Sequence, residues 1–313
     1  MQTNTHNHSR TDLPSHPFPI EQLDDLISPF LVTPRQQINL AKDYDPGFKA
    51  SYLKKSKAKG QLKAGIESLA KYQYLLYAQN THALLIIFQA MDAAGKDSTI
   101  KHVMSGINPQ GCQVHSFKAP SAEELDHDYL WRCSKALPER GRIGIFNRSH
   151  YEEILITRVH PEIMEQRQLP PHLIDEQVWE RRFEEINNFE KYLVNNGTII
   201  LKFFLNVSKE EQKERFLERI DRPEKNWKFS IGDAKERARW DDYMAVYEDM
   251  FNHTSTEWAP WYIIPADRKW FTRLVVAGII YTKLEELNLH YPKISKEKHR
   301  ELLKAKAILE SNE

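Results

Sequence analysis

The stretch of the sequence with the clearest chemical potential is QAMDAAGKDST, residues 89–99. It follows the apolar run LLIIFQ and leads into a helical pattern that resumes at Ile100. A strand, a glycine-containing loop and a helix start in this order bind phosphate, because successive backbone N–H groups and the positive helix end point toward the anion. Gly95 allows a close backbone approach, and Lys96 supplies a charge for the terminal phosphates. The other loop residues predicted to bind phosphate or nucleotide are Ala90, Ala93, Ala94, Asp97 and Ser98. An ordinary strand-to-helix turn is the alternative.

The same loop carries two carboxylates, Asp92 and Asp97, although phosphate is itself an anion. Carboxylates suit such a loop when a divalent cation shares the site, because Mg²⁺ is usually held by one or two carboxylates together with phosphates and water. Asp92 is therefore predicted to handle the metal or the phosphoryl acceptor. Asp97 has two interpretations, as a second metal ligand or as a first-turn residue that favours the helix dipole. Ala90 predicts a backbone without positive φ at that position.

A second polar cluster, NRSHYE, follows the apolar run RIGIF. Arg148 is predicted to bind a phosphate bidentately, and Glu152 to hold a metal-bound water or to orient an acceptor. Asn147 begins the cluster, emerges at the same place and is a further residue predicted to bind phosphate or nucleotide. His150 is interpreted as a structural or substrate-shaping residue rather than a general base, because phosphoryl transfer depends mainly on positioning and charge neutralisation.

Basic residues elsewhere extend this set. Lys118 follows the run CQVHSF, and Arg132 lies in a helical pattern upstream of RIGIF; each is otherwise an ordinary surface residue. In the charged segment 207–240, Arg215, Arg219 and Arg222 fall on one helical stripe at i, i+4 and i+7. This stripe is either a solvated ladder of ion pairs or part of a lid that folds its arginines over the transferring phosphates and excludes water.

The elements that must position these residues alternate along the chain. The apolar runs HALLIIFQA, CQVHSF, RIGIF, TIILKFFL and WYIIP predict five strands. Amphipathic helical patterns separate or precede them, as over residues 57–80. The alternation predicts an α/β fold with a parallel five-stranded sheet flanked by helices. In such sheets ligands bind at the carboxyl ends of the strands, where the loop 89–99 and the NRSHYE cluster both emerge.

The composition limits the classes of partner. Lysine plus arginine and aspartate plus glutamate both total 44, so the formal net charge is zero and gives no sign of nucleic-acid or membrane binding. Two cysteines, Cys112 and Cys133, are too few for a disulfide framework, and no apolar run approaches the roughly 18 residues of a membrane span. We expect a cytoplasmic protein that binds neither nucleic acid nor membrane.

Taken together, AMDAAGKDSTI, YLWR, FNRSHYEE and WYIIPADRKWFTR resemble the polyphosphate kinase 2 family from about residue 35 to 290. The family pattern G-x-D-x-x-G-K falls on Ala90, Asp92, Gly95 and Lys96, so the first position departs from it. The resemblance implies a P-loop kinase fold similar to thymidylate kinase, with a helical lid at about 207–240 and a channel for inorganic polyphosphate. We expect a flexible N-terminal tail over residues 1–34, this kinase domain over 35–295 and a C-terminal helical tail over 296–313.

The second family motif also differs in this chain. Asp-Arg-Ser is usual there, and the corresponding residues are Asn147, Arg148 and Ser149, so this chain has no aspartate at this position for a metal or base role. NRSHYE looks like the subgroup called class III, which phosphorylates both nucleoside mono- and diphosphates. In that subgroup the acidic residue matching Glu152 is thought to distinguish it from classes limited to one step.

The resemblance implies transfer of a terminal polyphosphate phosphoryl group to AMP, and onward from ADP to ATP, with reversal and with GMP and GDP as further acceptors. Mg²⁺, or Mn²⁺ in its place, would be held by Asp92, Asp97 and Glu152, with Asp92 facing the acceptor phosphate. Lys96 and the lid arginines would steady the transferring group, while Arg132 and Arg148 would grip donor or acceptor oxygens. The implied catalytic residues are Asp92, Lys96, Arg148 and Glu152, and the implied assembly is a homo-oligomer.

Three other interpretations remain from the sequence. An ATP-dependent nucleoside monophosphate kinase would share the core and differ in its donor. A GTPase-like switch is disfavoured because the chain has no N-K-x-D signature, and because Asp97 replaces the serine or threonine that normally follows the loop lysine. A chain that keeps the fold without activity would explain Ala90 and Asn147, although Lys96, Asp92 and Arg148 are all present.

Overall fold

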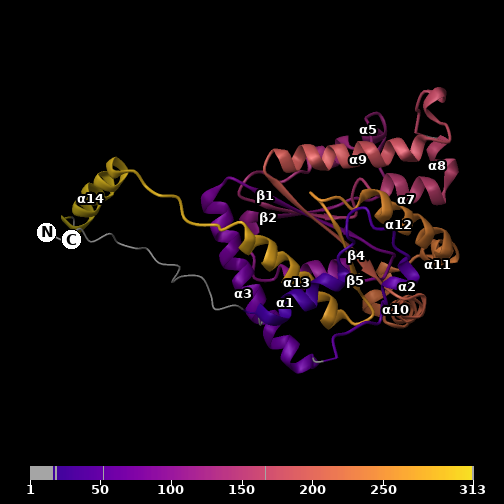
Figure 1. The fold of residues 1–313 in the computed structure, drawn as a ribbon, viewed down its shortest axis with the longest axis horizontal. Helices are drawn as coiled ribbons and strands as arrows, with labels where there is room; N and C mark the ends of the chain where they lie inside the picture. The colour runs from indigo at the N-terminus through magenta and orange to yellow at the C-terminus, as the bar shows by residue number, and fades with distance from the viewer. Residues whose placement is uncertain (1–16, 18–19, 52, 166, 312–313) are drawn as a thin grey trace.

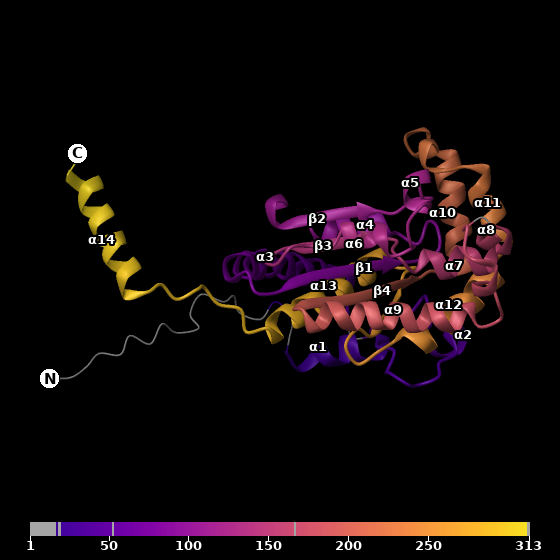
Figure 2. The same cartoon turned by 90° about the horizontal axis from the view of Figure 1, so that it is seen from above.

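The computed structural model describes residues 17, 20–51, 53–165 and 167–311. Its centre is a five-stranded sheet in the order β2-β3-β1-β4-β5, in which every neighbouring pair is parallel. The strands are β1 (Ala83–Gln89), β2 (Cys112–Ser116), β3 (Ile143–Asn147), β4 (Thr198–Asn206) and β5 (Trp261–Pro265). All five predicted strands are present, and the predicted α/β fold class is confirmed (Figures 1 and 2).

Strand β1 lies in the middle of the sheet, and all seven of its residues are buried, as its continuous apolar run predicts. The register places Phe88 of β1 beside Asn147 of β3, and Asn147 beside Ser116 of β2. The residues that follow these three positions therefore emerge at one edge of the sheet. This edge receives the loop 89–99, the NRSHYE cluster and the segment that contains Lys118.

Helices cover both faces of the sheet (Figure 1). On one side α9 (Val178–Asn195) packs on β4, and α12 (Trp240–Thr254) contacts both α9 and α7 (Glu152–Val159). On the other side α13 (Lys269–Glu286) packs against α3 (Lys55–Gln79), with the Tyr72 and Tyr281 rings in edge contact at 5.5 Å. The remaining α-helices are α1 (Ile20–Ile27), α2 (Leu40–Asp43), α4 (Lys96–Val103), α5 (Ala122–Leu125), α6 (Trp131–Lys135), α8 (Pro161–Glu165), α10 (Lys209–Asp221), α11 (Ile231–Ala238) and α14 (Lys296–Ser311). None of the helices in the described part of the chain is both long and apolar enough to cross a membrane.

The N-terminal expectation needs correction. Residues 1–16, 18 and 19 of the predicted tail lie outside the described residues, but residues 20–34 are part of the folded domain. Helix α1 contacts α13, and Leu23, Leu26 and Phe30 are buried in the main core. The backbone N–H of Val32 also donates to the Trp261 carbonyl at 2.9 Å. An amphipathic helix of only eight residues was hidden in a polar sequence context, which is why the pattern was missed.

The segment 207–240 rises from the site edge as α10, the 3-10 helix η4 (Pro223–Lys228) and α11. The Ser208 hydroxyl caps α10 by accepting the Glu211 N–H at 3.1 Å. At the other end of the chain, α14 lies well away from the sheet in both views, and all of its residues are exposed (Figures 1 and 2).

Candidate active site

The phosphate loop (residues 89–99) leaves the buried end of β1 and enters α4 at Lys96. Gly95 is the N-cap of this helix and has a φ of 112°, a backbone conformation that residues with a side chain rarely adopt. Within the loop Ala93 also has a positive φ, 63°, whereas Ala90 is not among the positive-φ residues. The prediction for Ala90 is therefore confirmed, and a glycine is not needed at that position.

Lys96 folds back along the loop. Its Nζ donates to the carbonyl oxygens of Ala90 at 2.7 Å and Met91 at 3.5 Å. Burial and the Arg148 guanidinium lower the pKa of Lys96 to about 8, although neighbouring carboxylates oppose this shift. A phosphate group at this position would favour the charged ammonium and reverse part of the shift.

An ion pair joins the phosphate loop to the turn after β3. Arg148 Nη2 donates to Asp92 Oδ1 at 2.7 Å, and each side chain keeps 35% of its surface exposed. Burial raises the pKa of Asp92, but the charges of Lys96 and Arg148 outweigh burial and hold this pKa below its ordinary value. Asp92 is therefore ionised at neutral pH, next to two cations and within reach of solvent.

Glu152 lies at the start of α7, beside the same cations. Burial raises its pKa even though Arg148 and Lys96 favour the charged form. With its amide nitrogen facing the carboxylate, Gln89 donates to Glu152 Oε1 at 2.8 Å and accepts from the Ser149 hydroxyl at 3.1 Å. The last residue of β1 thus holds Glu152 near Lys96 and Arg148.

The polar residues at the start of α4 are tied to their surroundings. Asn147 Nδ2 donates to Asp97 Oδ1 at 2.7 Å, which links the ends of β3 and the phosphate loop. Asp97 is exposed and lies in the first turn of α4, the position expected for a residue that interacts with the helix dipole. Ser98 accepts a hydrogen bond from Arg273 Nη2 of α13 at 2.7 Å. Ser98 is therefore held from outside the loop by an arginine that the sequence analysis did not single out.

Arg132 and Lys118 are brought together, but through a backbone oxygen. Arg132 Nη1 donates to the Lys118 carbonyl at 2.8 Å and lies 3.7 Å from Glu124 Oε2. Its guanidinium also stacks over the Phe117 ring, 5.4 Å from the ring centroid. These contacts fix Arg132 beside the site edge, while the Lys118 side chain is exposed.

A cavity of about 260 Å³ opens beside Arg132. Its lining includes His150, Glu153, Arg167 and Arg182 from the segments around α7 and α9. Within the part of the chain that the structure describes, the ring nitrogens of His150 and the Nε atoms of Arg167 and Arg182 are buried without hydrogen-bond partners. The lining combines these basic side chains with the carboxylates of Glu124, Asp128 and Glu185, so it can both donate to and accept from a polar ligand.

The predicted arginine stripe divides into three different environments. Arg215 is buried, and its guanidinium donates to the carbonyls of Ala93 and Ala94 at 3.0 and 2.7 Å. Further hydrogen bonds to the Ala266 and Asp267 carbonyls and to Glu211 occupy its remaining donors. The prediction that Arg215 reaches a transferring phosphate directly is wrong for this structure, because the side chain supports the loop backbone instead.

The other two stripe residues lie farther along α10. Arg222 is half exposed and pairs with Glu218 and Glu224, as the ion-pair ladder predicts. Arg219 donates to the Lys228 carbonyl at 3.3 Å, and its charge contributes to lowering the pKa of Asp92. The charge of Arg219 therefore acts on Asp92 in the phosphate loop, while its hydrogen bond goes to Lys228.

The predicted metal ligands do not form a ready-made cage. Among the residues that the structure describes, no group of three histidine, cysteine, aspartate or glutamate side chains is placed to hold a metal ion. Asp92, Asp97 and Glu152 instead interact with Arg148, Asn147 and Gln89, respectively. Such an arrangement is compatible with Mg²⁺, which commonly takes only one or two carboxylates and completes its shell with substrate phosphates and water.

Comparison with known proteins identifies the family. The family model described as polyphosphate kinase 2 matches residues 52–292, a region that includes the whole sheet and the site edge. The chain belongs to the polyphosphate kinase 2 family. The fold predicted from the resemblance is thereby confirmed as well.

Two curated relatives illustrate the range of this family. An ADP-polyphosphate phosphotransferase from Rhodopseudomonas palustris is 55% identical over 249 residues, which cover 79% of this chain and 86% of the relative. An AMP/ADP-polyphosphate phosphotransferase from Meiothermus ruber is 44% identical over 258 residues, covering 80% of this chain and 90% of the relative. The two relatives carry different acceptors in their names.

A solved polyphosphate kinase 2 structure from Arthrobacter aurescens has a TM-score of 0.79 and 41% identity, and the match covers 88% of this chain and 94% of that chain. A structure described as a polyphosphate kinase 2 from Pseudomonas aeruginosa has a TM-score of 0.70 and 34% identity, covering 79% of this chain and 50% of that chain. Membership of the family therefore rests on both sequence and fold.

Three residues at this polyphosphate kinase 2 site were missed by the sequence analysis. Gln89 orients Glu152, Gln212 Nε2 donates to the Asp92 carbonyl at 2.9 Å, and Arg273 binds Ser98. Gln212 and Arg273 come from α10 and α13, far from the loop in sequence, so no local spacing could have indicated them. Gln89 carried one signal, since it is a polar residue at the end of an otherwise apolar strand.

Proposed function

We propose that this chain transfers phosphoryl groups from inorganic polyphosphate to AMP and ADP, forming ADP and ATP reversibly, with GMP and GDP as further acceptors. The observation that carries the proposal is the cluster of Lys96, Arg148 and Asp92 at one sheet edge, in a chain of the polyphosphate kinase 2 family. Two cations beside an ionised carboxylate suit a reaction in which catalysis consists of positioning and charge neutralisation. An ATP-dependent nucleoside monophosphate kinase is the alternative, and the names of the relatives do not favour it.

Each site residue then has a role in that transfer. Lys96 and Arg148 neutralise charge on the transferring group, and the N–H groups of residues 93–98 cradle phosphate oxygens at the start of α4. Arg215 holds the Ala93 and Ala94 carbonyls and so keeps the N–H groups of this loop pointing toward the phosphate. Arg219 and Arg222 would reach the donor when the segment 207–240 acts as a lid. Arg132, which lines the cavity, and Lys118, whose carbonyl it binds, are the proposed residues of the acceptor side.

Mg²⁺, with Mn²⁺ as the substitute, is the proposed cofactor. Asp92 fits this role, because its carboxylate is ionised and partly exposed among the groups that meet phosphate. Asp97 and Glu152 are the further proposed ligands; one oxygen of each already accepts a hydrogen bond. The bound metal would neutralise phosphate charge, and Asp92 together with the donor and acceptor phosphates would hold it.

The cavity beside Arg132 is the proposed place for the nucleoside part of the acceptor. Nucleobases and ribose offer both donors and acceptors, and the arginines and carboxylates that line the cavity can pair with them. Glu152, at the start of α7, is the residue through which the resemblance implies action on both AMP and ADP. We further propose a cytoplasmic location, which the two free cysteines support, and a homo-oligomeric assembly, which rests on the family resemblance alone.

Donor and acceptor can be assigned in one set of reactions. The purified chain is incubated with Mg²⁺ and either AMP or ADP, with either polyphosphate or ATP as donor, and the nucleotides are separated by chromatography. We expect ADP and ATP from AMP with polyphosphate. Transfer from ATP to AMP in the absence of any reaction with polyphosphate would instead establish the nucleoside monophosphate kinase.

A further inference from the structure

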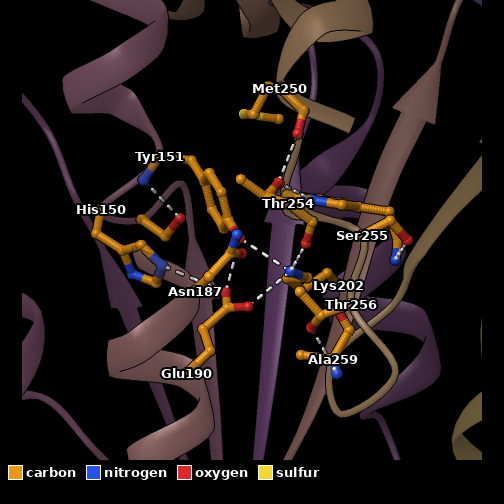
Figure 3. Close-up of polar contacts among 12 residues, drawn as sticks. His150, Tyr151, Asn187, Glu190, Lys202, Met250, Thr254, Ser255, Thr256 and Ala259 are labelled. Atoms are coloured by element: carbon orange, nitrogen blue, oxygen red, sulfur yellow. Dashed lines mark hydrogen bonds and ion pairs between the residues drawn. The ribbon is translucent and has the colours of Figure 1, made fainter. Parts of the chain in front are cut away.

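A charged network lies inside the core behind the site edge (Figure 3). Lys202 of β4 and Glu190 of α9 are both fully buried, and Lys202 Nζ lies 2.7 Å from Glu190 Oε2. The hydroxyl of Tyr151 sits between them: it donates to Glu190 Oε1 at 2.7 Å and accepts from Lys202 Nζ at 2.9 Å. Lys202 completes its donors with the Thr254 carbonyl at 2.7 Å.

The polar groups of Lys202, Glu190 and the Tyr151 hydroxyl all have hydrogen-bond partners. The three protons of Lys202 have three acceptors, both carboxylate oxygens of Glu190 accept a hydrogen bond, and the Tyr151 hydroxyl both donates and accepts. The surrounding rings leave little freedom, since Tyr151 packs on Trp261 with ring centroids 4.8 Å apart. His150 adds a ring 4.7 Å from that of Tyr151, and its Nε2 lies 3.5 Å from Glu190 Oε1. A complete network of this kind fixes one position for each side chain.

Stability alone does not explain charges at this place. Lys202 pairs with Ile87 of β1 and Trp261 of β5 in the middle of the sheet, where an apolar residue would fit the pattern of the neighbouring strands. Buried ion pairs can often be replaced by apolar residues of similar volume without loss of stability. The Glu190–Lys202 pair therefore has a role other than stabilising the core, and specifying one arrangement of the surrounding groups is such a role.

Tyr151 connects this network to the reactive edge. Its backbone N–H donates to the Ser149 hydroxyl at 3.2 Å, and it stands between Arg148 and Glu152 in the chain. Arg148 has a φ of 65°, a left-handed conformation that a residue with a side chain keeps only when its surroundings enforce it. Its N–H is held by the Phe88 carbonyl at 3.0 Å, which anchors one end of the turn. Tyr151 anchors the other end.

We propose that the Glu190–Lys202 pair is a positioning device for the phosphotransfer site, acting through the hydroxyl of Tyr151 on the turn 148–152. It sets the placement of Arg148 against Asp92 and of Glu152 against Gln89. Glu190 and Lys202 lie in the core and are positioning residues rather than catalytic ones. The expected effect on kcat rests on the proposed function, whereas the expected effect on the turn 148–152 does not.

The test uses the double variant Glu190→Leu/Lys202→Met, which removes both charges together and leaves neither unpaired. We expect a folded protein, because no unpaired charge is left in the core, although the Tyr151 hydroxyl and the Thr254 carbonyl each lose a partner. We expect kcat for phosphoryl transfer from polyphosphate to ADP to fall about 10- to 100-fold, with KM for ADP within about twofold, because a small displacement of Arg148 acts mainly on the transition state. Tyr151→Phe, which keeps the ion pair and removes its link to the turn, should lower kcat in the same way.

A matched control is the pair Arg158 and Asp249, which joins the end of α7 to α12 without contacting Tyr151. The variant Arg158→Met/Asp249→Leu should leave kcat within about twofold of the wild-type value. This ion pair lies at the other end of α7 from the turn 148–152 and has no link to Tyr151. Equal losses in both double variants would overturn the positioning role. So would a Glu190→Leu/Lys202→Met protein that keeps wild-type kcat.

Amide hydrogen exchange provides a second measurement that needs no activity. Exchange of the amides in residues 148–153 should be at least about tenfold faster in Glu190→Leu/Lys202→Met than in the wild type, with no change in α13. Unchanged exchange in this turn would refute the proposal. If the wild-type protein transfers nothing from polyphosphate, the proposed function fails, while the exchange result still decides whether the pair holds the turn.

Discussion

Arg148 Nη2 lies 2.7 Å from Asp92 Oδ1, so the turn after β3 is fastened to the phosphate loop after β1. The two strands are neighbours in the sheet, and their register brings Phe88 beside Asn147 immediately before the two segments. Because both charged groups remain 35% exposed, the pair can exchange its mutual contact for contacts with phosphate and metal. The effect of substituting Asp92 therefore reports directly on phosphate and metal binding at this site.

Asp92→Asn should weaken metal use more than Asp97→Asn. Asp92 is the ionised carboxylate nearest the two cations, whereas Asp97 is exposed and accepts from Asn147. We expect the Mg²⁺ concentration for half-maximal rate to rise at least about tenfold for Asp92→Asn, and less for Asp97→Asn. The measurement is a Mg²⁺ titration at fixed polyphosphate and ADP. The reverse order of the two variants would show that Asp97 is the principal metal ligand.

Lys96→Met should abolish catalysis without harming the fold. Removing the charge should lower kcat/KM at least about 10²- to 10³-fold, the size of effect expected for one preorganised electrostatic group. Burial lowers the pKa of Lys96, so the charged form is disfavoured in the folded protein and the apolar variant should unfold at an equal or higher temperature at pH 7. Steady-state rates and thermal unfolding check the two parts. A variant that loses activity because it unfolds below the wild-type midpoint contradicts this explanation.

The pH dependence should report the same lysine. With a pKa of about 8, Lys96 loses its proton as the pH rises through that value, and the neutral amine attracts phosphate less strongly. The kcat/KM for polyphosphate should therefore fall above pH 8, whereas an ordinary lysine would keep its charge to about pH 10. Lys96→Arg is the control, because any residual activity should lack this decline. A wild-type profile that is flat up to pH 10 would rule out the lowered pKa.

Arg215→Ala should destabilise the protein, and Arg222→Ala should not. Arg215 donates to carbonyls of Ala93, Ala94 and Ala266, and the variant removes this donor from the buried Ala94 and Ala266 oxygens. We expect a loss of about 2–4 kcal/mol in the free energy of unfolding for Arg215→Ala. Arg222 pairs at the surface, so its loss should cost less than about 1 kcal/mol. Urea denaturation measures both, and equal values for the two variants would be inconsistent with a loop-supporting Arg215.

Local sequence patterns predicted most of what places the site. All five strands were recognisable from apolar runs, and Lys96, Asp92 and Arg148 were expected at one edge because parallel strands end together. The ion pair between Arg148 and Asp92 was not predicted, because the sequence pattern assigned Arg148 to a phosphate and Asp92 to a metal. Local patterns were sufficient for the placement because Arg148 follows β3 directly, and Asp92 and Lys96 belong to the single loop that joins β1 to α4.

Contacts between distant segments could not be predicted in the same way. Arg215 was expected to face phosphate, but helix periodicity says which residues share a stripe and not what the stripe touches. Lys202 belongs to a run that predicts an apolar strand, and nothing local pairs it with Glu190 or Tyr151. The short helix α1 was taken for part of a tail, since eight residues give too little periodicity to distinguish it.

The most direct test of polyphosphate-dependent transfer uses ³²P-labelled polyphosphate as the sole donor, with unlabelled AMP and Mg²⁺. We predict that label enters ADP first and ATP next, and that Lys96→Ala transfers none. Labelled ATP replaces polyphosphate in the parallel reaction. Failure to label any nucleotide from polyphosphate, together with labelling of AMP by ATP, would contradict the proposed function.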